Sequence, residues 1–243
     1  MILADTRQHL SRSDAQLALR LLARSSGEEH DVLERRLADE GIDGILDDRR
    51  LPEALLRLPQ GAFASFPLFA YVIVRHALLR AGEDDRYLAD YVAAVVLQFG
   101  MHGRAHRIAG SDDQVYQALT DLFRDVDDPD TRRSFFVRTH LGNYALWLSG
   151  LFPDHIEQRR WKKGGPDLDY YEEMGRRGFQ LAASHRLAAQ HGLSALYTSA
   201  AEHFGALRTA LNTVSDTLFF PNVSTPERLM RQVKDEARWK LAS

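Results

Sequence analysis

Apolar residues recur at steps of three and four along most of the chain, the spacing that gathers side chains on one face of an α-helix. The clearest runs lie at residues 87–99 and 193–218, where aliphatic and aromatic side chains return at helical spacing. No segment alternates apolar and polar residues between turn residues, as a half-buried strand would. The pattern predicts an all-α protein without a sheet.

Capping residues and glycines divide this pattern into eleven expected helices. A hydroxyl followed three residues later by Glu or Gln, the pattern of a capping box, begins at Ser13, Ser26 and Ser111. Asp128 and Thr225 each precede a proline suited to the first helical position, and glycines close several of the runs. We expect helices over residues 13–25, 28–40, 52–58, 66–81, 85–99, 112–125, 129–149, 153–162, 169–191, 194–219 and 226–241.

The helices are expected to pack as one helical domain, a single compact bundle covering residues 1–243. The loosest stretch is residues 41–61, which contains three glycines and two prolines. The segment before it, about 40 residues, is too short to enclose a core of its own. Residues 1–60 are therefore expected to form at most a docked N-terminal helical subregion.

Composition narrows the chemistry that the chain can perform. With no cysteine, disulfides, thiolate metal sites and cysteine nucleophiles are excluded, and a reducing compartment is favoured. The first residues do not resemble a signal peptide, so we expect a cytoplasmic protein. The most apolar stretch, residues 62–79, is interrupted by Pro67, Arg75 and His76, so no membrane partner is expected. The net charge of -3 gives no general attraction to nucleic acid.

The segment 129–149 is apolar on almost every side and is expected to be the central helix. Gly142 and Ala145 lie on a face of small residues that permits the close approach of a neighbouring helix. His140 and Asn143, three residues apart on another face, are expected to be buried. Buried polar groups need hydrogen-bond partners, so this pair is a candidate for a polar site.

Two more histidines, His76 and His185, fall at positions that the helical pattern places inside. One hypothesis is that they converge with His140 on a metal, a haem or a small polar ligand between helices. The alternative, which we favour, is three separate core histidines, because no carboxylate lies nearby on these faces to support a metal. His102 and His106 are four residues apart, but the flanking glycines favour a polar loop over a metal site. The sequence assigns no metal ligands and no cofactor.

The sequence Arg159-Arg160-Trp161-Lys162-Lys163, followed by two glycines, is the most basic segment of the chain. Cations beside an aromatic ring and a flexible turn suit phosphate or single-stranded nucleic acid. The alternative is the solvated last turn of a helix, where cations offset the helix dipole and the tryptophan folds back onto the core. Arg176 and Arg177 on the next helix are candidates to extend the basic surface.

No phosphate-binding loop, dinucleotide fingerprint, nucleophile elbow or zinc-protease motif is present. The first expectation is therefore a non-catalytic binding or scaffold protein that binds a protein or a small molecule. The sequence also allows a homo-oligomer. It would use the basic segment and the amphipathic C-terminal helix with Leu229, Met230, Val233 and Trp239.

Two alternatives remain open. One is a helical enzyme, or a carrier of a ligand or metal, with a buried pocket around His76, His140, Asn143 and His185. The other is a phosphate or nucleic-acid binder that acts through residues 159–163.

Overall fold

The computed structural model describes residues 1–23, 27–101, 104–109 and 112–242. All regular structure in these residues is helical, with thirteen α-helices, three short 3-10 helices and one π-helical turn. The described residues contain no strand. The prediction of an all-α protein is confirmed.

The helices belong to two compact units, one formed by Ile2–Gln98 and the other by Met1 with Phe99–Ser243. The loose stretch at residues 41–61 lies within the first unit and does not separate the two. A single domain over the whole chain stays a prediction. Each unit is described by itself below.

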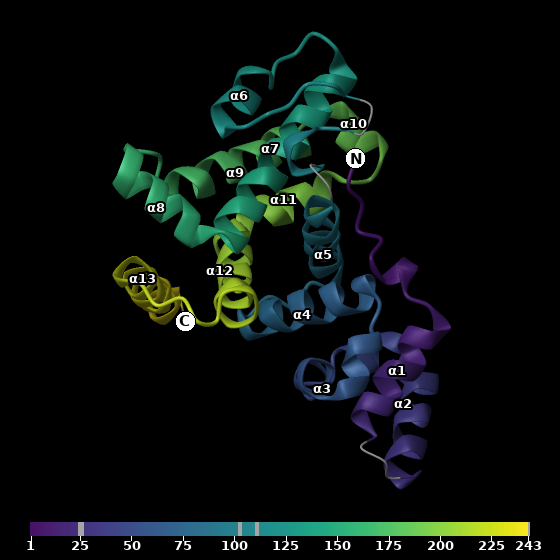
Figure 1. Cartoon of the computed structure of the whole chain (residues 1–243). Helices are drawn as coiled ribbons and strands as arrows, with labels where there is room; N and C mark the ends of the chain where they lie inside the picture. The colour runs from purple at the N-terminus through teal and green to yellow at the C-terminus, as the bar shows by residue number, and fades with distance from the viewer. Residues whose placement is uncertain (24–26, 102–103, 110–111, 243) are drawn as a thin grey trace. The chain divides into compact units, whose positions relative to one another are not determined.

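The first unit holds the five N-terminal helices, with the last two residues of α5 assigned to the second unit (Figure 1). These helices are α1 (Arg12–Leu22), α2 (Gly27–Leu46), α3 (Leu51–Arg57), α4 (Phe66–Arg80) and α5 (Arg86–Gly100). Within α2, Gly41 has φ 71° and interrupts the helical backbone, a conformation that glycine adopts at little cost. The expected stop at Gly41 is therefore an interruption, after which the helix resumes.

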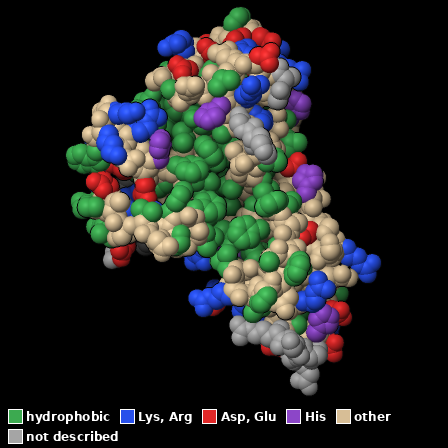
Figure 2. All heavy atoms as spheres, viewed as in Figure 1, with side chains coloured by type: hydrophobic (Ala, Val, Ile, Leu, Met, Phe, Trp, Pro, Cys, Tyr) green, Lys and Arg blue, Asp and Glu red, His purple; other side chains and the backbone are tan. Residues whose placement is uncertain are grey.

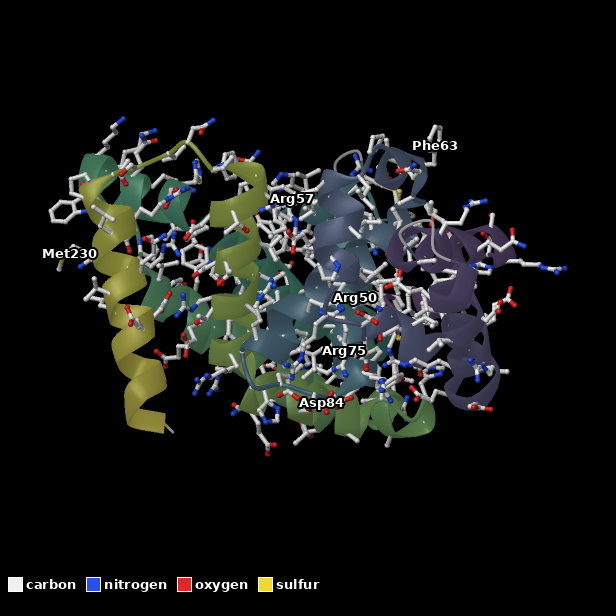
Figure 3. All side chains as sticks on the ribbon, turned by 90° about the horizontal axis from the view of Figure 1, so that it is seen from below. Arg50, Arg57, Phe63, Arg75, Asp84 and Met230 are labelled. Atoms are coloured by element: carbon white, nitrogen blue, oxygen red, sulfur yellow. The ribbon has the colours of Figure 1, made fainter. Side chains whose placement is uncertain are left out.

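An ion cluster joins α4 to the ends of α2 and α5 in the first unit. The buried Arg75 donates from Nε to Asp47 at 2.9 Å and from Nη2 to Asp84 (Figure 3). Arg86 also donates to Asp47, at 2.7 Å. Burial alone would raise the pKa of Asp47, but the hydrogen bonds from Arg75 and Arg86 outweigh burial and lower it. The cluster keeps a buried guanidinium charged and paired.

The second unit is built around α7, which packs against most of its other helices. Its helices are α6 (Leu119–Arg124), α7 (Thr131–Leu151), α8 (Pro153–Lys163), α9 (Leu168–Ala183), α10 (Arg186–Gln190), α11 (Ser194–Glu202), α12 (Phe204–Val214) and α13 (Pro226–Ala242). Figure 1 shows α7 and α9 side by side. His140 and Asn143 are each 3% exposed, which confirms that the predicted central helix buries both.

Small residues set the distance between α7 and α9. A Cβ atom on Gly142 would lie 2.6 Å from Cδ1 of Phe179, and one on Gly178 would lie 2.6 Å from the backbone nitrogen of Gly142. Neither position has room for a larger side chain. The stripe of small residues on α7 therefore allows the close approach that the sequence predicted.

Three of the expected helix starts can be compared with the structure. Ser11, not Ser13, caps α1 through a capping box with Asp14. Asp130, not Asp128, caps α7, because its carboxylate accepts from two backbone N–H groups of the first turn. Thr225 caps α13 as predicted, accepting from the N–H of Arg228 at 3.2 Å. The predicted starts at Ser26 and Ser111 lie outside the described residues.

Two long expected helices are divided, and one is shortened. The segment 169–191 forms α9 and α10, separated where His185 caps α10 with its ring nitrogen. The segment 194–219 forms α11, α12 and a π-helical turn at Ser215–Phe219. The break between α11 and α12 falls at His203. The helix expected at 112–125 is reduced to α6.

Candidate binding groove

A groove of about 920 Å³ opens in the second unit between α7, α8 and the segment 215–225. Its walls are mainly apolar, with side chains that include Tyr144, Trp147, Leu148, Phe152, Ile156 and Phe220. Figure 2 shows hydrophobic side chains gathered beside the Lys and Arg side chains at the position of α8. A concave apolar site with a few polar groups at its edge is the usual form of a small-molecule pocket.

The turn between α7 and α8 places one aromatic side chain at the base of this groove. Phe152 leaves the helical conformation, with φ -127° and ψ 43°, and Pro153 then starts α8. Proline at the first helical position needs no N–H partner and cannot continue the preceding helix. The ring of Phe152 lies 4.8 Å from that of Trp147 and 6.2 Å from that of Phe220, centroid to centroid. The ring of Phe152 therefore packs against an aromatic ring from each of the two walls.

The α7 wall is a column of stacked rings. His140 lies 5.9 Å from Tyr144 with an interplanar angle of 7°, and Tyr144 lies 6.2 Å from Trp147 with an angle of 19°. Of these three rings, those of Tyr144 and Trp147 line the groove and that of His140 does not. Burial raises the pKa of Tyr144 to about 12, while the positive charge of Arg159 acts in the opposite direction. The phenol is therefore neutral at physiological pH.

Arg228 of α13 holds the opposite wall in place. It is 4% exposed and donates from Nη1 to the carbonyl oxygens of Phe220 and Val223, at 2.8 and 2.9 Å. Its Nε also donates to Asp154 of α8 at 2.9 Å. The segment 215–225 is thus tied to the start of α8 by one guanidinium group.

A row of polar and cationic side chains on α8 borders the groove. His155, Arg159 and Lys162 line it and follow one another at steps of four and three, so they share a face of the helix. In the described part of the chain, Arg159, Lys162 and Lys163 form no ion pair, unlike Arg160, which lies 3.8 Å from Glu157. These three cations are available for an anionic partner.

A second, smaller hollow of about 340 Å³ lies along the same row. It is lined by His155, Gln158, Arg159, Lys162 and Lys163. Four of these residues also line the larger groove, so the two hollows adjoin. We call Arg159, Lys162 and Lys163 the α8 cationic row.

Trp161 lies at the end of the groove and is 71% exposed. The guanidinium of Arg160 lies 6.0 Å from the centre of its ring. The alternative in which this tryptophan folds back onto the core is therefore wrong. The other part of that alternative, a solvated cationic helix end, describes the segment well.

The three predicted core histidines have separate partners. His140 Nε2 lies 2.9 Å from the carbonyl oxygen of Ala105, so this nitrogen carries a proton and donates. Burial, with the positive charge of Arg104, lowers the pKa of His140 to about 3, which keeps the ring neutral. The ring stacks under the groove wall but does not line the groove.

His76 lies in the first unit, where its Nε2 is 2.9 Å from the carbonyl oxygen of Leu46 and burial lowers its pKa. His185 is not inside a helix. Its Nδ1 accepts from the N–H of Leu187, and its ring stacks on Phe135 with centroids 5.2 Å apart. No group of three or more metal-ligating side chains occurs among the residues that the structure describes.

The remaining predicted site residues lie outside the groove. Asn143 is buried but does not line it. Arg176 donates to Glu172 at 2.7 Å, and the guanidinium of Arg177 lies 5.8 Å from the centre of the Phe123 ring. Neither arginine extends the lining beyond α8. His102, which precedes His106 by four residues in the segment expected to be a polar loop, lies outside the described residues.

Sequence reasoning missed most of the apolar lining. The walls include Phe152 and Phe220, each followed directly by a proline, together with Ile156 and Val223. An aromatic residue beside a proline at the end of a helix was the available signal. It marks a side chain held at a turn, where it can border an opening.

Compared with protein-family models, curated proteins and solved structures, the chain has no match. The described helices include none with the length and apolar character needed to cross a bilayer.

Proposed function

We propose that this protein is a non-catalytic binding protein whose groove holds an anionic amphiphile. The apolar body of the ligand would occupy the groove, and its acidic head would meet the α8 cationic row. One observation carries the proposal: Arg159 and Lys162 border an aromatic-lined groove and have no ion-pair partner in the described residues.

The dimensions and lining of the groove support a small apolar ligand. Its volume of about 920 Å³ lies within the range of pockets that enclose drug-sized molecules, about 300–1,000 Å³. Each methylene group that leaves water contributes about 0.8 kcal/mol. A medium-length hydrocarbon tail would therefore supply enough free energy to offset the cost of association.

The cations support an acidic head group. Arg159 offers a planar fork of donors that matches a carboxylate or phosphate, and Lys162 offers a compact charge. The acidic residue nearest the start of α8, Asp154, is engaged by Arg228 and Arg231. The row can therefore attract an anion although the chain as a whole has a net charge of -3.

The proposal is tested by titrating the full chain with dodecyl phosphate, dodecanol and dodecyltrimethylammonium, each below its micelle concentration. Dodecyl phosphate is expected to bind saturably, and the other two about tenfold or more weakly, a difference of about 1.4 kcal/mol. Calorimetry or displacement of a fluorescent probe gives the affinities.

Two double variants locate the head group. Arg159→Gln with Lys162→Gln is expected to lower the affinity for dodecyl phosphate about tenfold and to leave the affinity for dodecanol unchanged. The matched control is Arg176→Gln with Arg177→Gln, which removes two cations that do not line the groove. The proposal fails if no compound saturates, or if both double variants weaken binding equally.

A further inference from the structure

The C-terminal part of α8 projects from the second unit. Every residue from Gln158 to Gly164 is exposed, whereas Pro153 and Ile156 at the start of the helix are buried. The helix ends at Gly164, which has φ 65°. The projecting part therefore holds an exposed tryptophan among four cations at the end of the groove.

This combination of side chains suits the surface of a lipid bilayer. Tryptophan prefers the boundary between the head groups and the hydrocarbon, because its ring is apolar and its N–H still finds a partner there. Lys and Arg place their apolar stems in the same boundary with the charge in the head groups. Each Lys or Arg near an anionic leaflet contributes about 1 kcal/mol to the free energy of membrane binding. Helix α8 carries two acidic residues against these four cations: Glu157, which pairs with Arg160, and Asp154, which Arg228 and Arg231 engage.

The groove has apolar exposed residues at its edge as well. Phe220 and Val223 line it and are 38% and 39% exposed. Trp161 lines it too and is 71% exposed. A hydrocarbon tail that entered along these residues would stay in contact with apolar surface, so its transfer would avoid the cost of exposing it to water.

A single-stranded nucleic acid fits these observations less well. The four cations fall within five consecutive residues, about 6 Å of helix, and one aromatic ring is exposed among them. Binding of a strand uses a longer cationic channel and several stacking rings, over about four nucleotides or more. A deep apolar groove beside the cations also has no role in binding phosphodiesters.

We infer that the projecting end of α8 docks on an anionic bilayer with Trp161 at the interface, and that the groove exchanges its amphiphile with that bilayer. This inference rests on the proposed function for the identity of the ligand. The partner is a lipid surface with net negative charge, and the attachment is peripheral and reversible. It departs from the expectation of no membrane partner, which rested on the lack of an apolar stretch long enough to span a bilayer.

The test uses the full chain with Trp147→Phe and Trp239→Phe, so that Trp161 is the one remaining tryptophan and gives the fluorescence signal. Vesicles of phosphatidylcholine alone, and of phosphatidylcholine with phosphatidylglycerol, are added at low and high salt. We expect sedimentation and a blue shift of the emission with the anionic vesicles only, and a loss of both at high salt.

Variants of exposed aromatic residues complete the test in the wild-type background. Trp161→Ala is expected to weaken sedimentation with anionic vesicles about tenfold. The control is Phe63→Ala, which removes an 82% exposed ring from the first unit and is expected to change nothing. Equal losses in the two variants would overturn the inference.

The outcomes separate this inference from the proposed function. Saturable binding of monomeric dodecyl phosphate without vesicle binding would overturn the inference and leave the proposed function standing. Vesicle binding without any binding of the monomer would overturn the proposed function and support the docking surface alone. Quenching of Trp161 by a single-stranded oligonucleotide, with no response to vesicles, would assign the surface to nucleic acid and overturn the inference.

Discussion

Arg228 and Asp154 are joined by a hydrogen bond of 2.9 Å between Nε and a carboxylate oxygen, although they are 74 positions apart in the chain. Through the same guanidinium group, α13 also holds the carbonyl groups of Phe220 and Val223. One buried side chain therefore fixes both the position of α13 and one wall of the groove.

Arg228→Met is expected to destabilise the protein and weaken ligand binding. It leaves Asp154 with Arg231 alone, at 3.4 Å, and removes the Arg228 donor from the carbonyl oxygens of Phe220 and Val223, of which that of Phe220 keeps the N–H of Val223 at 3.2 Å. The cost is about 3 kcal/mol, the lower end for breaking a buried ion pair, because Asp154 is 29% exposed. Urea unfolding followed by circular dichroism measures the loss.

The matched control is Arg57→Met. Arg57 forms an exposed ion pair with Glu53 at 3.2 Å, and exposed pairs of this kind contribute about 0–1 kcal/mol. Equal stability losses at Arg57 and Arg228 would show that the buried network does not hold the wall.

The helix contact between α7 and α9 gives a second prediction. Gly178→Ala places a Cβ atom 2.6 Å from the backbone nitrogen of Gly142, where no flexible side chain can move aside. We expect a loss of about 1–3 kcal/mol of unfolding free energy, the usual cost of overpacking. Gly100→Ala, which meets no atom within 4 Å, is the control and is expected to leave stability unchanged or slightly higher. A neutral Gly178→Ala would mean that the helices can separate without cost.

Hydrophobic periodicity predicted the helical class and the central place of the segment 129–149, because both depend on local spacing. It could not predict the orientation of α13. The inward side chains of this helix are charged, and they include Arg228, Arg231 and Asp235, which are 4%, 5% and 8% exposed. The spacing of apolar residues identifies the apolar stripe of α13, but it does not show that the opposite, charged face docks through ion pairs.

The outer face of α13 is correspondingly apolar. Leu229, Met230 and Val233 are 55%, 61% and 62% exposed, and Figure 3 shows Met230 pointing away from the neighbouring helices. The sequence proposed this stripe as a contact surface, and its exposure is compatible with that role. Its partner stays a prediction.

The groove was only partly predictable for a similar reason. The basic segment was recognisable from composition, because its five residues are consecutive. The apolar walls come from α7, α8 and the segment 215–225, and their meeting depends on the turn at Phe152 and on the hydrogen bonds of Arg228. The histidines were singled out correctly as interior groups on α4 and α7, but side-chain spacing cannot reveal that backbone carbonyl groups satisfy them.

The burial of His140 predicts a loss of stability in mild acid. Its pKa is lowered to about 3 in the folded protein by burial, whereas the unfolded chain has the ordinary value of 6.5. Between these values the unfolded state binds the additional proton, so stability falls as the pH falls from 6.5 towards 3. The full effect is on the order of 5 kcal/mol.

The variant His140→Gln tests this origin. Its amide can donate to the carbonyl oxygen of Ala105 but cannot titrate. Unfolding free energies of both proteins at neutral pH and at mildly acidic pH are compared. The wild type is expected to lose more stability on acidification than the variant. Identical losses would place the acid sensitivity elsewhere, for example at His76, whose pKa burial also lowers.

The depth of the groove predicts how affinity depends on the length of the ligand. Each added methylene group is expected to tighten binding about fourfold, the equivalent of about 0.8 kcal/mol, until the groove is filled, after which affinity becomes constant. Leu148→Trp, which enlarges a half-buried side chain in the wall, should bring this plateau to shorter tails. Leu56→Trp, on an exposed position of α3, is the control and should not move it. Calorimetry with a series of alkyl phosphates measures both, and an affinity independent of tail length would show that the tail lies in solvent and that the α8 cationic row alone binds the ligand.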